Sequence, residues 1–160
     1  MGTRSAGIML FRIADRAPEV LLVHPGGPFW RNKDAGAWSI PKGEHDPEER
    51  PEAAAVREFA EETGLVLDAA ELTGLGEVRQ RGGKVVTAFA AEGDFDVTAL
   101  RSNEFELAWP PRSGRVQRFP EVDRALWCTP ETARDKLLPA QVAFLDRLSD
   151  LLAEAHRIDR

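Results

Sequence analysis

The segment 43–65, GEHDPEERPEAAAVREFAEETGL, constrains the fold more than any other part of the chain. Pro51 suits the first turn of a helix, and Gly64 stands where a left-handed residue would end that helix. Glutamates gather at the amino end, where the helix dipole favours negative charge. Val56 and Phe59 belong to a narrow apolar stripe that can pack on a sheet. The sequence therefore predicts a capped helix with one apolar side and one acidic side.

The acidic side of this helix carries three carboxylates. At 3.6 residues per turn, Glu58, Glu61 and Glu62 lie on one face. Like charges at this spacing destabilise a bare helix, whereas a divalent cation among them would hold hard oxygen ligands together, and Mg2+ or Mn2+ is the expected ion. Because most glutamate-rich helix faces are only solvated, the wider spacing decides between the two interpretations.

The spacing of the whole segment is specific. Five residues separate Gly43 from Glu49, seven more precede Arg57-Glu58, and the frame closes at Leu65. This pattern resembles the Nudix hydrolase signature, G-x5-E-x7-R-E-U-x-E-E-x-G-U, at every fixed position. The one mild departure is Phe59, where the family more often has an aliphatic residue. The resemblance implies an enzyme that hydrolyses a nucleoside diphosphate linked to another moiety X, mostly by positioning and electrostatics.

The resemblance also implies a set of metal ligands. Glu58, Glu61 and Glu62 match the ligand positions, and Glu58 and Glu62 are expected to coordinate most directly. The backbone carbonyl of Gly43 matches a further ligand that the family often uses. Which ligand holds which ion stays open at this point.

Residues beside the carboxylates are expected to support them. Arg57 is four residues from Glu61 and eight from Glu49, so it can reach both along the helix and orient them; a plain surface ion pair is the alternative. Lys42 flanks the turn before the helix and is better placed to touch phosphate. Pro41-Lys42-Gly43 is similar to the entry of the box in diadenosine polyphosphate and diphosphoinositol hydrolases.

A general base usually comes from outside the box in this family, on a loop before a late strand. Glu121, six residues before Trp127, is the first candidate. Asp123, Glu104 and Glu106 are its rivals, and each is otherwise a solvated carboxylate.

Candidates for substrate contacts follow the box. Arg112 and Arg115 belong to a basic stretch that could bind a long polyphosphate, although they could equally form a solvated loop. Trp109 and Trp30 lie in or beside loops, where an aromatic ring can stack on a base. Core packing is the alternative for any one of these rings.

Composition limits the class of protein. With 160 residues and 42% hydrophobic residues, the chain suits one domain, 1–160, with a core over about 5–150. A net charge of −6 argues against a stable nucleic-acid partner. Cys128 is the single cysteine, so no internal disulfide forms, which fits a cytoplasmic protein. No signal peptide or membrane span is expected, and a monomer or a homodimer is possible.

Strand and helix patterns alternate along the chain. Arg81-Gly82-Gly83 is a strong hairpin signal. Strands are predicted over 5–13, 19–24, 38–40, 72–80, 84–91, 103–109 and 125–128, a basic loop over 110–121, and helices from Thr129-Pro130 and over 139–155. This order favours an α/β fold, a mixed sheet with helices packed on it, and matches the Nudix-type α/β/α sandwich that the resemblance implies.

Three functions remain in competition. The first is a metal-dependent pyrophosphohydrolase acting on nucleoside polyphosphates or dinucleoside polyphosphates. The second is a hydrolase of nucleoside diphosphate sugars or other nucleoside diphosphate conjugates. The third is a Nudix module that binds a nucleotide without hydrolysing it; such modules typically lose box carboxylates, which this chain retains.

Overall fold

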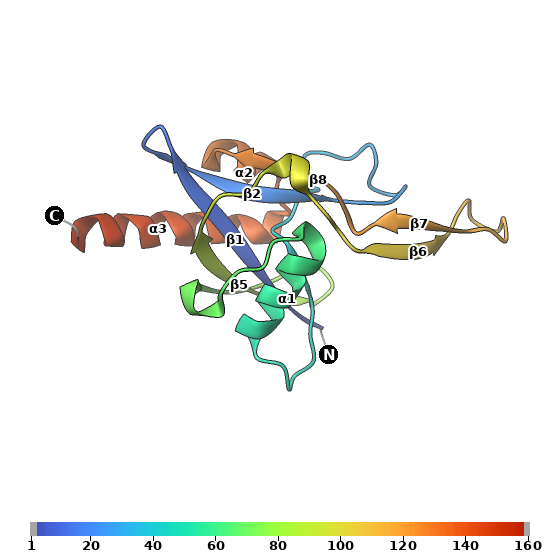
Figure 1. Ribbon diagram of the computed structural model, residues 1–160, viewed down its shortest axis with the longest axis horizontal. Helices are drawn as coiled ribbons and strands as arrows, with labels where there is room; N and C mark the ends of the chain where they lie inside the picture. Colours follow the sequence, from blue (N-terminus) through green and yellow to red (C-terminus); the bar gives the residue numbers. More distant parts are fainter. Residues whose placement is uncertain (1–2, 159–160) are drawn as a thin grey trace.

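The computed structural model describes residues 3–158, so the predicted domain 1–160 extends past both ends of the described residues. Strands and helices alternate along the chain (Figure 1). The strands are β1 (Arg4–Ala14), β2 (Ala17–Pro25), β3 (Lys42–Glu44), β4 (Thr73–Arg79), β5 (Val85–Glu92), β6 (Glu104–Ala108), β7 (Val116–Pro120) and β8 (Val122–Cys128). The helices are α1 (Pro51–Thr63), α2 (Pro130–Lys136) and α3 (Val142–Ile158).

A mixed sheet forms the centre of the molecule. Its strand order is β4-β5-β1-β2-β8, and β3 pairs with the first part of β1. β1 and β5 run parallel, and the other pairs are antiparallel. From Ser5 to Phe11 every residue of β1 is buried, which is typical of a strand covered on both faces.

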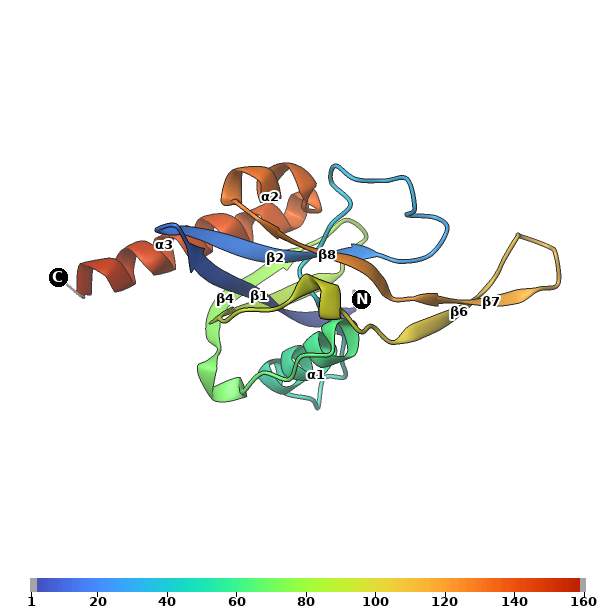
Figure 2. The same cartoon turned by 45° about the horizontal axis from the view of Figure 1, so that its top comes forward.

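Helices cover both faces of this sheet. α1 packs Ala54, Ala55 and Phe59 on one face, in a cluster with Ile8 and Phe89. The other face buries a second cluster that includes Phe144 and Leu148 of α3. Figure 2 shows the sheet between α1 on one side and α2 and α3 on the other. The α/β/α sandwich predicted from the sequence is therefore confirmed.

Two local predictions differ from the structure. Residues 38–40 form isolated bridges, Ser39 with Val23 and Trp38 with Leu137, and the strand β3 begins only at Lys42. The stretch 110–121, expected as a loop, contains β7, which pairs with β6 in a separate two-stranded ribbon. All but two of the β7 side chains are exposed, so the stretch carries no clear apolar alternation that would indicate a strand.

The β6–β7 ribbon projects from the body of the molecule, as both cartoon views show (Figures 1 and 2). Its strands pair only with each other. No helix among residues 3–158 is long and apolar enough to cross a membrane.

Candidate functional site

Helix α1 presents the acidic face that the sequence predicts. Pro51 occupies its first turn, and Gly64 ends it in the left-handed conformation with φ 89°. Phe59 is fully buried and anchors the apolar side on the sheet. The opposite side carries Glu58, which is itself only 8% exposed, together with the half-buried Glu62.

Two glycines let β3 and α1 approach each other closely. A Cβ on Gly43 would lie no more than 2.6 Å from either carboxylate oxygen of Glu58. A Cβ on Gly7 of β1 would lie 2.5 Å from the carbonyl oxygen of Pro41 and 2.6 Å from Cβ of Lys42. Gly7 therefore leaves no room for a side chain, because backbone lies in the way, whereas a side chain at Gly43 would force the Glu58 carboxylate to move. The structure thus brings Gly43 against Glu58, two of the predicted metal ligands.

Arg57 ties the carboxylates together. Its Nε and Nη2 donate to the two oxygens of Glu49 at 3.0 and 2.9 Å. Its Nη1 donates to Glu58 at 2.7 Å and to Glu61 at 3.3 Å. These hydrogen bonds lower the pKa of Glu49 and raise that of Arg57. The contacts that the spacing of Arg57 predicted are thus present.

Glu62 is held by the chain that enters the box. The backbone N–H of Lys42 donates to Glu62 Oε1 at 3.3 Å. Burial raises the pKa of Glu62 to about 8, with help from the charges of Glu121 and Glu58, against the opposing effect of Lys42. Burial and the charge of Lys84 lower the pKa of the Lys42 ammonium. Without a further cation, Glu62 therefore holds its proton to a higher pH than an exposed glutamate does.

Two neighbouring carboxylates, Glu58 and Glu121, also have raised pKa values. Burial raises the pKa of Glu58, and the charge of Glu61 raises it further, although Arg57 opposes both effects. Burial and the charge of Glu61 likewise raise the pKa of Glu121. Like charges and burial together destabilise the ionised forms. A divalent cation suits these hard oxygen donors, because its charge would offset their burial and their mutual repulsion.

The carboxylates are arranged around Arg57 and not around an ion. Among the described side chains, no three of the histidine, cysteine, aspartate and glutamate residues converge closely enough to hold a metal as they stand. Arg57 pairs with Glu58 and Glu61 instead. The donor set fits a cation chemically, and binding one requires these carboxylates to draw closer together than they lie here.

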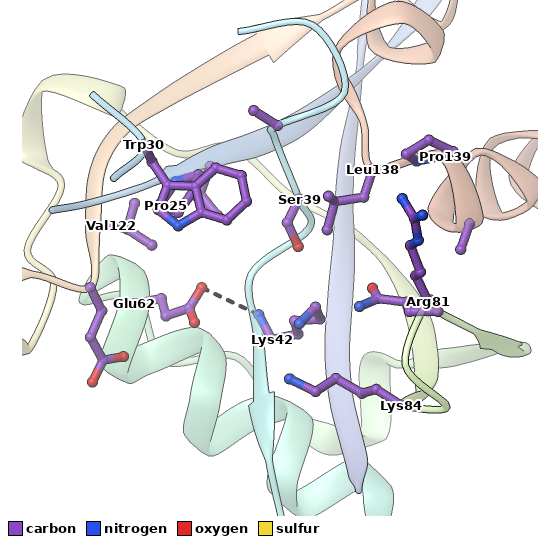
Figure 3. A pocket seen from close by; sticks show the side chains of 15 residues that line it. Pro25, Trp30, Ser39, Lys42, Glu62, Arg81, Lys84, Val122, Leu138 and Pro139 are labelled. Carbon is purple, nitrogen blue, oxygen red and sulfur yellow. Dashed lines mark hydrogen bonds between the residues drawn. The ribbon is translucent and has the colours of Figure 1, made fainter. Parts of the chain in front are cut away.

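A cavity of about 900 Å3 opens beside these carboxylates. Figure 3 shows Glu62 and Trp30 on one side, Arg81 and Lys84 on the opposite side, and Lys42 between them. The remaining lining residues are Val23, Pro25, Ala37, Ser39, Gln80, Glu121, Val122, Leu138, Pro139 and Ala140. The cavity thus has an acidic end, a basic end and an apolar wall, the composition typical of a site for a small charged ligand.

Three of the residues singled out in the sequence line this cavity: Lys42, Glu121 and Trp30. Their roles stay predictions. Arg81 and Lys84 were missed: they flank the Gly82-Gly83 turn between β4 and β5, which was interpreted only as a hairpin signal. A cation on each side of a glycine pair is the signal that could have drawn attention to them.

The predicted substrate contacts of the β6–β7 ribbon lie elsewhere. Arg112 and Arg115 are exposed in the turn between its strands, and neither lines the cavity. Trp109 packs edge-on against Phe29, with 5.2 Å between ring centroids. The structure does not bring these three residues together with Glu62. Of the rivals to Glu121, Glu104 and Glu106 are exposed on the same ribbon.

Comparisons with known proteins agree with this architecture. The NUDIX domain family matches residues 1–148. A MutT-like protein of Streptomyces ambofaciens is 32% identical over 92 residues, which are 58% of this chain and 59% of that protein. A putative 8-oxo-dGTP diphosphatase 3 of Mycobacterium tuberculosis is 41% identical over 58 residues, 36% of this chain and 25% of that protein. The chain therefore spans less than two thirds of the length of either relative.

Solved structures share the fold over nearly the whole chain. An Ap4A hydrolase of C. elegans, in a binary complex, superimposes with a TM-score of 0.62 at 24% identity, covering 95% of this chain and 98% of its own. The NUDIX domain of Shewanella oneidensis NrtR, complexed with ADP ribose, gives 0.64 at 19% identity, covering 95% and 89%. Because the family match extends over nearly all of a chain with a complete signature at Gly43–Leu65, this protein belongs to the Nudix hydrolase family.

Proposed function

We propose that this protein is a metal-dependent pyrophosphohydrolase that cleaves a phosphoanhydride bond of a nucleoside polyphosphate or a dinucleoside polyphosphate. The observation that carries the proposal is the cavity of about 900 Å3, where Glu62 of the box meets a basic wall of Lys42, Arg81 and Lys84. A polyphosphate needs both a site for cations and protein cations of its own, and this cavity offers both.

The residues that would hold the metal are Glu58, Glu61, Glu62 and the carbonyl of Gly43. Nudix hydrolases generally use divalent metals, and Mg2+ suits these hard oxygen donors, with Mn2+ as a second choice. When bound, the metal neutralises charge on phosphate oxygens and lowers the pKa of a bound water.

The protein's own side chains supply positioning and proton transfer. Arg57 orients Glu49, Glu58 and Glu61 through the hydrogen bonds described above. Glu121 is the proposed general base, because it lines the cavity and burial raises its pKa toward the working range of a base. A base with a raised pKa holds the proton of the attacking water more firmly than an exposed carboxylate does.

The opposite wall would bind the substrate. Lys42, Arg81 and Lys84 are the proposed contacts of the phosphate chain, and a guanidinium such as Arg81 can take a phosphate through two parallel hydrogen bonds. Trp30 offers a flat ring for a base at the other side. Arg112, Arg115 and Trp109 remain predicted contacts only for a substrate long enough to reach the ribbon.

Nucleoside diphosphate conjugates are the second substrate class. The Shewanella oneidensis domain was solved with ADP ribose, whereas the C. elegans protein is an Ap4A hydrolase and the Mycobacterium tuberculosis relative is named for 8-oxo-dGTP. Both solved structures are under 25% identical to this chain, so they do not choose among these substrates. A binding module without catalysis is disfavoured because the box retains Glu49, Glu58, Glu61 and Glu62.

The test is a substrate panel assayed with Mg2+, with products identified by mass. The panel holds nucleoside triphosphates, diadenosine tetraphosphate, ADP ribose and a nucleoside diphosphate sugar. We expect turnover that vanishes with a chelator and is lost in the matched variant Glu62→Gln, which excludes a contaminating hydrolase. Binding of a nucleotide without formation of any product would identify a binding module instead. A cytoplasmic location and a monomeric or homodimeric state stay predictions.

A further inference from the structure

A second cavity, of about 500 Å3, lies on another part of the surface. It shares no lining residue with the cavity at Glu62. It forms between the loop after β2, the middle of β8 and the end of α2. Its lining residues are Arg31, Asn32, Lys33, Asp34, Trp38, Arg124, Ala125, Leu126 and Lys136. A concave site of this size is within the range that binds small ligands.

Positive charge dominates this second cavity. Four of its nine lining residues are cations, and Asp34 is its one carboxylate, although the whole chain carries a net charge of −6. Lys136 donates to both oxygens of Asp34, at 2.9 and 3.1 Å, so these two charges largely cancel. Three cations remain, Arg31, Lys33 and Arg124, and converging charge in a cleft attracts anions.

These three cations have little internal compensation. No ion pair of Arg31 or Lys33 occurs within the described part of the chain, and the Lys33 ammonium rests over the Trp30 ring at 5.1 Å. Arg124 lies 3.6 Å from Asp123 and 5.3 Å from the centroid of the Trp38 ring, and its charge also helps to lower the pKa of Asp34. Asp123 makes its shorter contact, 2.8 Å, with Nδ1 of His24. Among the described residues Arg124 donates no hydrogen bond to a side chain, so its N–H groups remain available to a ligand.

The buried side chain of His24 holds two walls of this cavity, the loop after β2 and the strand β8. His24 is fully buried, and its two ring nitrogens contact Asp123 Oδ1 at 2.8 Å and the carbonyl of Lys33 at 2.7 Å. One side chain thus links the loop to β8. Because a site whose walls are already fixed loses less entropy on binding, this link favours a ligand.

From these contacts we propose that the second cavity binds a small phosphate-bearing ligand, at a site separate from the Glu62 cavity. Arginine binds phosphate in a planar, two-point geometry, and two arginines face this cavity. Leu126, which is 36% exposed, and the largely buried Trp38 also line the cavity and give it an apolar part for an uncharged portion of the ligand. A long nucleic acid would need a basic surface much wider than this one cleft.

Inorganic tripolyphosphate is the probe, and the protein is first freed of divalent metal. Removing the metal takes away the cation proposed for the Glu62 cavity, whereas the second cavity needs no metal. Binding is measured by calorimetry, and the perturbed amides are located by 15N NMR. We expect one site, with shifts at Ala125, Leu126 and Lys136.

Two variants test the assignment. The variant Arg31→Ala/Arg124→Ala should weaken tripolyphosphate binding by about tenfold or more, since both guanidiniums contact the anion. Arg31→Glu alone should weaken it as well, and this residue is exposed and unpaired among the described side chains, so the fold is spared. The control Arg16→Ala/Arg79→Ala removes the same charge from exposed residues that line neither cavity, and should bind as the wild type does.

Three results would overturn the proposal. The first is no binding to the metal-free protein. The second is an equal loss in the control variant, which would mean that net charge alone attracts the probe. The third is a set of shifts centred on Lys42 and Lys84, which would place the anion in the first cavity. None of these readouts depends on hydrolysis, so the proposed function is tested separately.

Discussion

Replacing Gly43 by alanine should lower the catalytic rate strongly while lowering the stability of the fold only slightly. The new Cβ would lie no more than 2.6 Å from either oxygen of Glu58. Since an ordinary contact at this position is 3.4 Å or longer, the nearer carboxylate oxygen has to retreat by about 1.5 Å. The backbone at Gly43 is not left-handed, so alanine adds no backbone strain. The side chain of Glu58 is the part that moves.

The expected cost in stability is modest. The shift disturbs the 2.7 Å hydrogen bond from Arg57, a charged interaction worth about 1.5–3 kcal/mol at most. Arg57 is 40% exposed, so water screens part of this energy. Alanine also recovers about 0.5–1 kcal/mol by restricting the unfolded chain. A net loss of about 1 kcal/mol would lower the Tm by about 2–4 °C.

The expected cost in rate is much larger. A misplacement of about 1 Å in a catalytic group can cost about a hundredfold, and Glu58 is a proposed metal ligand. We therefore expect kcat/KM to fall by about a hundredfold or more for the best substrate of the panel. The Mg2+ concentration for half-maximal activity should rise as well, because one ligand is displaced.

Gly74→Ala is the matched control. Gly74 also lies in a strand, and a Cβ there would meet nothing within 4 Å. It should leave both kcat/KM and the Mg2+ requirement unchanged. If Gly43→Ala keeps a kcat/KM within about threefold of this control, the close approach of Gly43 and Glu58 has no catalytic meaning and the reasoning is refuted.

Three further predictions concern charge. Glu62→Gln should lose about a hundredfold or more in kcat, as is typical when a key electrostatic group is removed, and should keep its fold; near-normal turnover would show that Glu62 is not a ligand. Metal-free protein should lose stability as the pH rises from about 4.5 to about 8, because Glu62 binds a proton in the folded state but not in the unfolded state over that window. Added Mg2+ competes with that proton, so its effect on Tm should grow between pH 6 and pH 8.5; a Mg2+ effect that shrinks with pH would contradict this. Arg81→Ala/Lys84→Ala should reduce kcat/KM for polyphosphates more than Arg112→Ala/Arg115→Ala, since only the first pair lines the cavity, and the reverse order would restore the ribbon as the main substrate contact.

Local patterns made the box predictable. Helix α1 begins at Pro51 and ends before Gly64, as their residue types predict. The contact of Arg57 with Glu61 depends only on helix spacing. Such relations are fixed within one element, so the sequence contains them directly. The order of strands and helices likewise indicated the sandwich.

Tertiary relations explain what the sequence did not predict. Lys84 comes near Lys42 because β3 and β5 both pair with the start of β1, Lys42 opposite Gly7 and Val85 opposite Arg4. That register joins segments more than forty residues apart and leaves no local signal. The strand β7 was missed for a different reason. Its side chains are mostly exposed, so it is a strand because it hydrogen-bonds to β6 and not because it buries an apolar face.

The parallel pairing of β1 with β5 affects how the site assembles. The partners, from Arg4↔Val85 to Phe11↔Glu92, are about eighty residues apart. Local hairpins close quickly, but this pair has to pay the entropy of a long loop first. Phe59 of α1 packs in the cluster that contains Phe89 of β5. During synthesis the box is therefore complete at Leu65. Its helix, however, has no finished surface to pack on until β5 has left the ribosome. We expect the carboxylates to reach their native positions only then.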